Sequence, residues 1–199
     1  MVEMIIVVAV LGIIVTITGV GWSSVTSSNR DQARAQDLKQ WASTFDLYKS
    51  RYAIYPILPP NPGSGIPGRT FCLGTFNQDQ PANYGRKCGQ YKLTAISNRT
   101  FDANSTETRG MLAEVKKIGN VPLNSSYATR DAVVGPILYI EKNPGSGTSV
   151  NVTAKFVNFF EGSCPTGLQA ETDPGIINIA NGISNVSVCT LRKSFTYYP

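Results

Sequence analysis

Residues 4–22, MIIVVAVLGIIVTITGVGW, form a stretch of 19 residues without a charge, and the rest of the chain is interpreted around it. As an α-helix rising about 1.5 Å per residue, it would extend about 28 Å and match a hydrocarbon core of about 30 Å. A secretory signal peptide is the alternative, but its apolar region is usually about 7–15 residues long and follows basic residues. Here Glu3 precedes the stretch, and no small-residue cleavage site follows Trp22. We therefore expect a transmembrane helix.

Four residues of this region stand apart from its aliphatic character. A carboxylate in lipid costs a few kcal/mol, so Glu3 should stay at the interface or find a cationic partner. Each glycine costs up to about 1 kcal/mol of helix propensity relative to alanine, and it marks a place where the helix packs closely or unwinds. Plain packing through small residues is the alternative. The glycines are Gly12, Gly19 and Gly21.

Beyond the apolar stretch, the helix should continue as an amphipathic one. Aromatic and aliphatic residues recur every three or four positions, the spacing of one helix face. They are Leu38, Trp41, Phe45, Tyr48 and Tyr52. We expect this stripe to pack on the C-terminal part of the chain, and we expect the remaining surface to carry Arg34, Asp37, Lys39, Asp46 and Lys49. Tyr55-Pro56 and the proline-rich run 59–63 end the helix, which should span residue 3 to about 53.

The segment from Pro56 to Pro199 is rich in Gly, Pro, Asn, Ser and Thr, which is typical of a β-rich head. Residues 56–90 should form an irregular surface loop, and 110–118 a short helix. A hairpin loop is expected at 142–147. Strands are expected at 91–96, 133–141, 150–160 and 186–197.

These elements predict an α+β fold. A long N-terminal α-helix, half transmembrane and half amphipathic, should pack on a C-terminal antiparallel β-sheet head of three or four strands. The expected parts are the transmembrane half of the helix, its amphipathic half, and the globular head: residues 1–22, 23–55 and 56–199.

Composition excludes several kinds of chemistry. The 199 residues include no histidine, which excludes a Ser-His-Asp triad, a Cys-His dyad and His-ligated zinc. No glycine-rich loop precedes a helix as a phosphate cradle would require. Glu171 and Asp173 lack the ligand count of a calcium loop and should lie in a solvated turn. We expect no enzyme, no catalytic residue, no cofactor and no metal site.

The cysteines predict disulfides. Their spacing lacks a Cys-x-x-Cys pair, which argues against a zinc or redox centre. Three pairings are open, and we favour the two local ones, each contributing about 3 kcal/mol. Four free thiols in a cytosolic head are the alternative, whereas disulfides place the head outside a reducing cytosol. The favoured pairs are Cys72–Cys88 and Cys164–Cys189.

Short surface motifs do not decide the function. Asn-x-Ser/Thr triplets are only slightly more frequent than chance gives, so glycosylation stays open; they begin at Asn98, Asn104, Asn124, Asn151 and Asn185. Basic pairs could attract the phosphates of DNA, but such isolated pairs are usually solvated surface. They are Arg86-Lys87, Lys116-Lys117 and Arg192-Lys193.

Several features occur together at the N-terminus. Met1-Val2-Glu3-Met4 leads into the uncharged stretch, RAQDLKQWASTFDLYKSRY follows at 34–52, and Tyr55-Pro56 leads into a β-rich head with a cysteine pair near its end. In these features the chain resembles a bacterial type IV pilin. The resemblance covers residues 1–56 closely and the rest only by architecture.

The resemblance implies roles for single residues. Glu3 matches a glutamate that neutralises the N-terminal amine of an adjacent subunit in the fibre. Gly12 matches a glycine where the helix unwinds in the filament. Val20 replaces the proline at the far end of that unwound segment, but the glycines at 19 and 21 flank it and leave a route to local melting. Family members are cleaved after a glycine and N-methylated on a phenylalanine. Neither residue precedes Met1, so we expect the leader and the first two mature residues to be missing from this sequence.

The implied function is that of a major structural pilin. Such a subunit sits in the cytoplasmic membrane until the pilus assembly machinery extracts it, and it then polymerises with identical subunits into an extracellular filament. The contacts are head-to-tail, so they build an open polymer. Adhesion, twitching motility and DNA uptake are not distinguished. The alternatives are a pseudopilin of a type II secretion system, a single-pass membrane receptor or adhesin, and, least favoured, a membrane-tethered enzyme.

Overall fold

The computed structural model describes most of the chain. Within the first helix, the side chains of residues 2, 3, 5 and 14–24 lie outside the description. The described residues are 2–56, 69–73, 87–89, 100–102, 106–122, 127–129, 132–134, 136–143, 150–173, 176 and 186–197.

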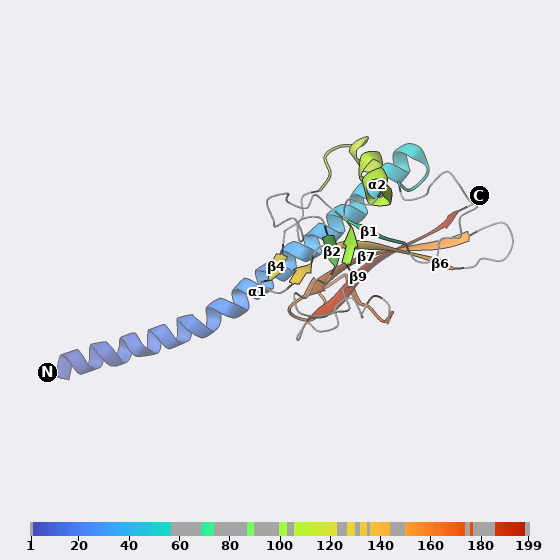
Figure 1. The fold of residues 1–199 in the computed structure, drawn as a ribbon. Helices are drawn as coiled ribbons and strands as arrows, with labels where there is room; N and C mark the ends of the chain where they lie inside the picture. The colour runs from blue at the N-terminus through green and yellow to red at the C-terminus, as the bar shows by residue number, and fades with distance from the viewer. Residues whose placement is uncertain are drawn as a thin grey trace.

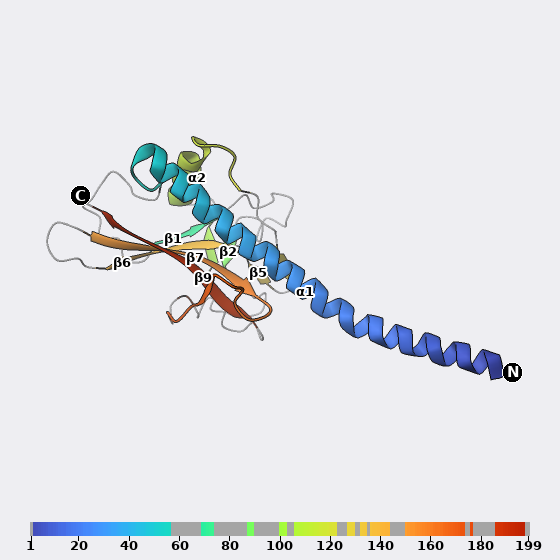
Figure 2. The same ribbon diagram turned by 180° about the vertical axis from the view of Figure 1, so that it is seen from behind.

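A single long helix, α1 (Val2–Tyr52), runs through the molecule. Its N-terminal half extends away from the rest, and its C-terminal half lies on a β-sheet (Figures 1 and 2). The helix ends where Ala53 takes a positive φ of 60°, a left-handed conformation common at helix ends. Lys49 and Arg51 in the last turn interact favourably with the helix dipole. The bounds lie within one residue of the predicted ones.

The sheet that receives α1 has five antiparallel strands in the order β1-β6-β7-β9-β8. Its central strand, β7, is hydrogen-bonded to β9 along its whole length and to β6, on its other side, over Asn151–Val157. The strands are β1 (Arg69–Cys72), β6 (Ile137–Asn143), β7 (Val150–Phe160), β8 (Gln169–Ala170) and β9 (Ser187–Tyr197).

Smaller elements surround this sheet. The helix α2 (Thr106–Lys116) lies beside the C-terminal end of α1 (Figures 1 and 2). Two further antiparallel pairs are β2 (Lys87–Gly89) with β3 (Thr100–Asp102), and β4 (Tyr127–Thr129) with β5 (Ala132–Val134). The described part of the chain is thus α+β with an N-terminal helix and an antiparallel sheet, as predicted.

The structure corrects three details of the predicted strands. The expected strand 133–141 is divided into β5 and β6, with Pro136, which has no N–H to donate to a ladder, between them. The expected hairpin loop starts too early, because β6 continues to Asn143. Residues 56–90 are not wholly irregular, since β1 joins the main sheet and buries Phe71. The expected strand 91–96 lies outside the described residues.

The core lies between the second half of α1 and the sheet. Trp41 and Phe45 are fully buried, and the Phe45 ring meets the ring of Phe156 in β7 edge-on with centroids 5.2 Å apart. Full burial of such a side chain contributes about 1.5–3 kcal/mol. Leu38 and Tyr48 of the expected stripe are buried as well, whereas Tyr52 is 39% exposed. The stripe therefore ends one turn earlier than expected.

Candidate functional site

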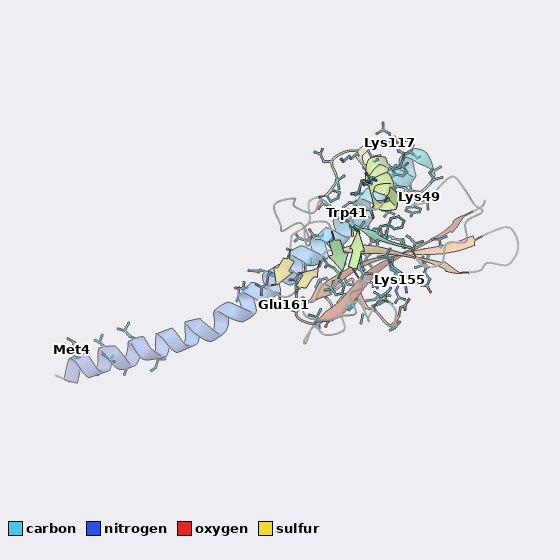
Figure 3. All side chains as sticks on the ribbon, in the orientation of Figure 1. Met4, Trp41, Lys49, Lys117, Lys155 and Glu161 are labelled. Carbon is cyan, nitrogen blue, oxygen red and sulfur yellow. A yellow bond between two sulfur atoms is a disulfide. The ribbon has the colours of Figure 1, made fainter. Side chains whose placement is uncertain are left out.

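The most unusual surface is the exposed N-terminal part of α1. We call residues 4–13 the apolar rod; among its described side chains none is buried, and Met4 is 74% exposed. Monomeric soluble proteins rarely leave contiguous apolar surface of this kind uncovered. Figure 3 shows Met4 at the end of the helix far from the head. The exposed large side chains are Met4, Ile6, Val7, Val8, Val10, Leu11 and Ile13.

The apolar rod is apolar on all sides. Successive helix positions are rotated by about 100°, so these seven side chains and the exposed Ala9 are distributed around the axis with no gap wider than about 100°. A single partner helix buries only one stripe of its neighbour, as in a two-stranded coiled coil. Covering the whole circumference requires either several neighbouring helices or lipid.

The residues proposed for assembly all lie in α1. Glu3 stands in its first turn, with its side chain outside the description. Gly12 lies in the apolar rod, where an added Cβ would meet nothing within 4 Å. The helix passes without a break through Gly19 and Gly21. Among the described residues, no helix combines the length and hydropathy that crossing a bilayer requires.

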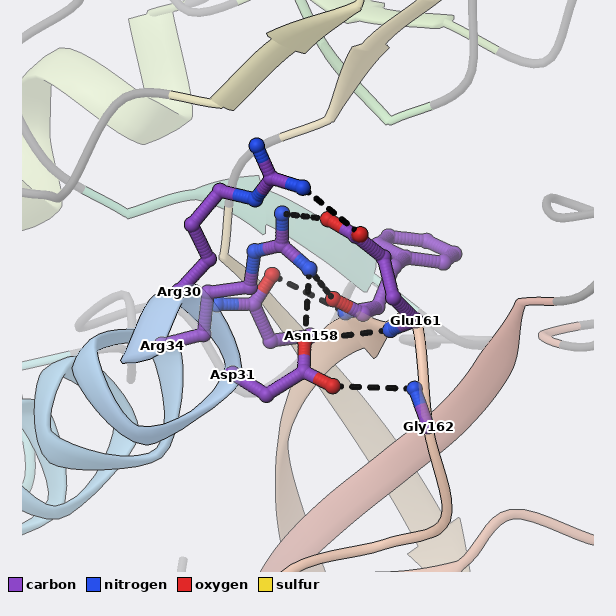
Figure 4. A network of polar contacts seen from close by, with 7 residues as sticks. Arg30, Asp31, Arg34, Asn158, Glu161 and Gly162 are labelled. Carbon is purple, nitrogen blue, oxygen red and sulfur yellow. Dashed lines mark hydrogen bonds and ion pairs between the residues drawn. The ribbon is translucent and has the colours of Figure 1, made fainter. Parts of the chain in front are cut away.

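A group of polar contacts joins α1 to the head where the helix leaves the sheet (Figure 4). The Asp31 carboxylate accepts hydrogen bonds from the backbone N–H of Glu161 at 3.0 Å and of Gly162 at 2.9 Å. Both residues directly follow β7. Asp31 therefore binds backbone donors at the point where the sheet ladder of β7 has ended.

Arg34, one turn further along α1, completes this group. Its guanidinium donates to Asp31 at 2.8 Å, to the Phe159 carbonyl at 3.1 Å and to Glu161 at 3.2 Å. Arg30 donates to the other oxygen of Glu161 at 2.9 Å. The group contains two positive and two negative charges, so its net charge is zero. Pairing of this kind offsets the cost of partly burying charges. We call Arg30, Asp31, Arg34 and Glu161 the junction cluster.

The burial of the junction cluster corrects the sequence analysis, which placed Arg34 and Asp37 on the surface. The Arg34 side chain is 4% exposed, and Asp37 is buried too. The Asp31-x-x-Arg34 spacing, which lets two oppositely charged side chains meet on a helix, was the available signal. Nothing in the sequence showed that the end of β7 would cover them.

A second ionic group lies on the opposite face of the sheet from α1. The Lys155 side chain is 6% exposed, and its Nζ lies 3.0 Å from Glu141, 3.5 Å from Glu171 and 3.7 Å from Asp173. Burial lowers the pKa of Lys155, but the hydrogen bond that its ammonium donates to Glu141 and the charges of the three carboxylates outweigh burial and hold the pKa above its usual value. Lys155 is thus charged and paired within the head.

Glu171 is not in a solvated turn, contrary to the prediction. Its side chain is fully buried, and Oε1 accepts from the backbone N–H of Thr172 and Asp173 and from Arg192 at 3.3 Å. Its Oε2 is buried without a hydrogen-bond partner in the described part of the chain. The described residues contain no group of three or more His, Cys, Asp or Glu arranged to hold a metal ion.

A disulfide closes the segment that carries Glu171. Cys164 and Cys189 are bonded, with their Cα atoms 5.6 Å apart, which confirms that predicted pair. Cys72 is disulfide-bonded as well, and the described residues include no free cysteine. The side chain of its expected partner, Cys88, lies outside the description.

Tyr48 links α1 to α2 and predicts a pH dependence. Its hydroxyl donates to Glu114 at 2.6 Å, and burial, with this bond and the Glu114 charge, raises the pKa of Tyr48 from 10.0 to about 12. The fold therefore favours the neutral phenol, and this stabilisation is complete below pH 10 and is lost as the pH rises towards 12. The variant Tyr48→Phe lacks this titration.

Urea unfolding at about pH 8 and about pH 11.5 tests this expectation. The midpoint of the unmodified protein should fall more between the two conditions than that of Tyr48→Phe. Equal decreases in both proteins would show that Tyr48 does not contribute to the alkaline loss of stability.

Comparison of the chain with protein-family models, curated proteins and solved structures finds no match.

Proposed function

We propose that this protein is the major structural subunit of a type IV pilus. Its N-terminal helix would be held in the cytoplasmic membrane before assembly, and the assembled form would be an extracellular helical filament of identical subunits. No catalytic step or cofactor belongs to this function.

The apolar rod is the observation that carries the proposal. Its described side chains are all exposed, and it belongs to the same helix whose second half is covered by its own head. Each large aliphatic side chain gains about 1.5–3 kcal/mol when it leaves water, so an uncovered rod is strongly unfavourable there. Lipid covers such a rod before assembly, and the rods of several sister subunits cover it in a filament. Head-to-tail contacts of this type extend into an open polymer.

The filament proposal also gives Glu3 a partner. A carboxylate at the edge of an apolar helix is costly unless a cation neutralises it. The N-terminal amine of a neighbouring subunit would supply that cation inside the filament. Glu3 then acts in polymer formation and has no part in keeping the protein in the membrane.

Electron microscopy of material sheared from the cell surface tests both statements. Fibres containing this polypeptide are expected for the unmodified protein. Glu3→Ala should reduce their number by at least about tenfold, the effect of losing roughly 1.4 kcal/mol, while the amount of membrane-bound subunit is unchanged. Asp46→Ala, which removes an exposed carboxylate of the same helix, is the matched control and should leave fibre number unchanged.

The other outcomes identify the alternatives. A protein that stays in the membrane as a single copy without fibres is a receptor or adhesin. Short periplasmic fibres that need a secretion system identify a pseudopilin. Normal fibres from Glu3→Ala contradict the role assigned to Glu3.

A further inference from the structure

We propose that the junction cluster is a clamp that fixes the head on α1 and transmits force between the apolar rod and the sheet. The inference rests on the proposed function. In a filament built from the rods, a load applied to the heads is resisted by the rods, so force passes through α1 between the two parts of each subunit. The clamp itself is a property of the single subunit, so it can be tested without a filament.

The junction cluster lies at the boundary between the free and the covered parts of α1. Among the described side chains, Asp31 is the first buried one along the helix. The preceding described side chains, from Val25 to Arg30, are exposed or half-buried. Glu161 lies beside α1 at the point where the helix leaves the head (Figure 3). A pull on the rod therefore reaches the head at this cluster before it reaches the apolar core.

The contacts of the cluster suit it to hold the helix against a pull. Asp31 binds two consecutive backbone N–H groups, and Arg34 binds a backbone carbonyl, all at the end of β7. Hydrogen bonds to a charged partner are about twice as strong as neutral ones. Because β9 pairs with β7 along its whole length and β6 pairs with it over Asn151–Val157, a force that reaches the backbone of β7 passes to both neighbouring strands.

A second ion pair between α1 and the head provides a contrast. Asp46 and Lys193 are 2.7 Å apart, but both side chains are well exposed. Exposed pairs contribute little, since water screens them. Asp46 therefore offers a matched control, a carboxylate of the same helix that also bonds the head but lies outside the clamp.

Hydrogen exchange on the detergent-solubilised full chain tests the clamp in the single subunit. In Asp31→Ala, the amides of residues 28–37 should exchange at least about tenfold faster than in the unmodified protein, while those of β7 and β9 change by less than about twofold. Asp46→Ala should change neither group. A general loss of stability would accelerate exchange in residues 28–37 and in the two strands together. Acceleration confined to 28–37 therefore shows that Asp31 holds this part of α1 on the head.

A milder variant keeps the test usable if Asp31→Ala does not fold. Asp31→Asn keeps the size of the side chain and one carbonyl acceptor, so its exchange at 28–37 should lie between those of the unmodified protein and Asp31→Ala. If Asp31→Ala does not fold, Asp31→Asn is judged by the same local acceleration. Exchange at 28–37 that is the same in the Asp31 variants and in Asp46→Ala overturns the clamp.

A measurement on fibres tests the transmission of force. Fibres of the Asp31 variant should break at lower shear than fibres of Asp46→Ala, although equal numbers assemble. Equal shear resistance overturns the mechanical role. Absence of fibres from the unmodified protein refutes the proposed function instead, and the exchange result then still decides whether the cluster holds the head on α1.

Discussion

Lys155→Met is expected to lower the free energy of unfolding by about 3–5 kcal/mol, because removing one partner of a buried ion pair leaves the other charge uncompensated. The group that loses its buried cation is the carboxylate of Glu171, whose side chain is fully buried. Arg192 alone would remain as its cation, at 3.3 Å and partly exposed. Urea unfolding of the disulfide-bonded protein measures the change.

Lys193→Met is the matched control for this prediction. Lys193 lies on the neighbouring strand β9 and also pairs with a carboxylate from another element, but its side chain is 38% exposed. Its replacement should change the free energy of unfolding by less than about 1 kcal/mol. Similar effects of the two substitutions would contradict the assignment of Lys155 to a buried ionic group.

A double variant separates the charge from the packing. In Lys155→Met with Glu171→Leu, both buried charges that face each other are replaced by apolar side chains, which is often neutral or stabilising. The double variant should therefore be more stable than Lys155→Met alone. If it is less stable, the hydrogen bonds that Glu171 accepts from Thr172, Asp173 and Arg192 outweigh the cost of its lost cation.

The periodic parts of the chain could be predicted from the sequence. Spacings of three and four residues gave α1 and its buried face at Trp41 and Phe45, because helix geometry places such positions on one side. The strand at 150–160 was found with its observed bounds, since a run rich in β-branched and aromatic residues follows a Gly- and Pro-rich loop. Local sequence patterns were sufficient to predict these elements, because each pattern depends only on the residues of one helix or strand.

Contacts between distant segments could not be predicted in this way. Arg34 is charged, so its burial depends on Glu161 and the end of β7, more than 120 residues further along the chain. The burial of Glu171 likewise depends on Lys155 and Arg192 from two other strands. Charge alone predicts exposure, and only pairing across the fold reverses that expectation. Short β1 was missed because four residues within a Gly- and Pro-rich region carry little periodicity.

The sequence predicted that the apolar rod consists of apolar residues, but it did not predict which of their side chains are exposed. The structure adds that the rod projects beyond the head and that all of its described side chains are exposed. An apolar stripe on only one side of the helix would have favoured a pair of helices. An apolar surface on all sides favours an environment that surrounds the helix, which both lipid and a bundle of sister helices provide.

Val8→Asp is expected to abolish polymerisation. Val8 lies in the middle of the apolar rod and is 68% exposed in the single subunit. In a filament it would be enclosed by apolar neighbours, where a carboxylate costs about 2.5–3.5 kcal/mol or more per subunit. The equilibrium for adding a subunit should therefore weaken by at least about 60-fold. Subunits purified in detergent, freed of detergent and counted as sedimentable fibres by electron microscopy provide the measurement.

Two variants show whether the effect belongs to the rod. Val8→Leu keeps the apolar surface and should polymerise like the unmodified protein. Gln36→Asp adds the same charge to an exposed position of α1 that lies beside the head. It should reduce fibre formation far less than Val8→Asp, because that position can keep its contact with water. If Val8→Asp forms fibres as readily as Gln36→Asp, the rods are not enclosed by one another, and contacts between heads would have to hold the polymer together.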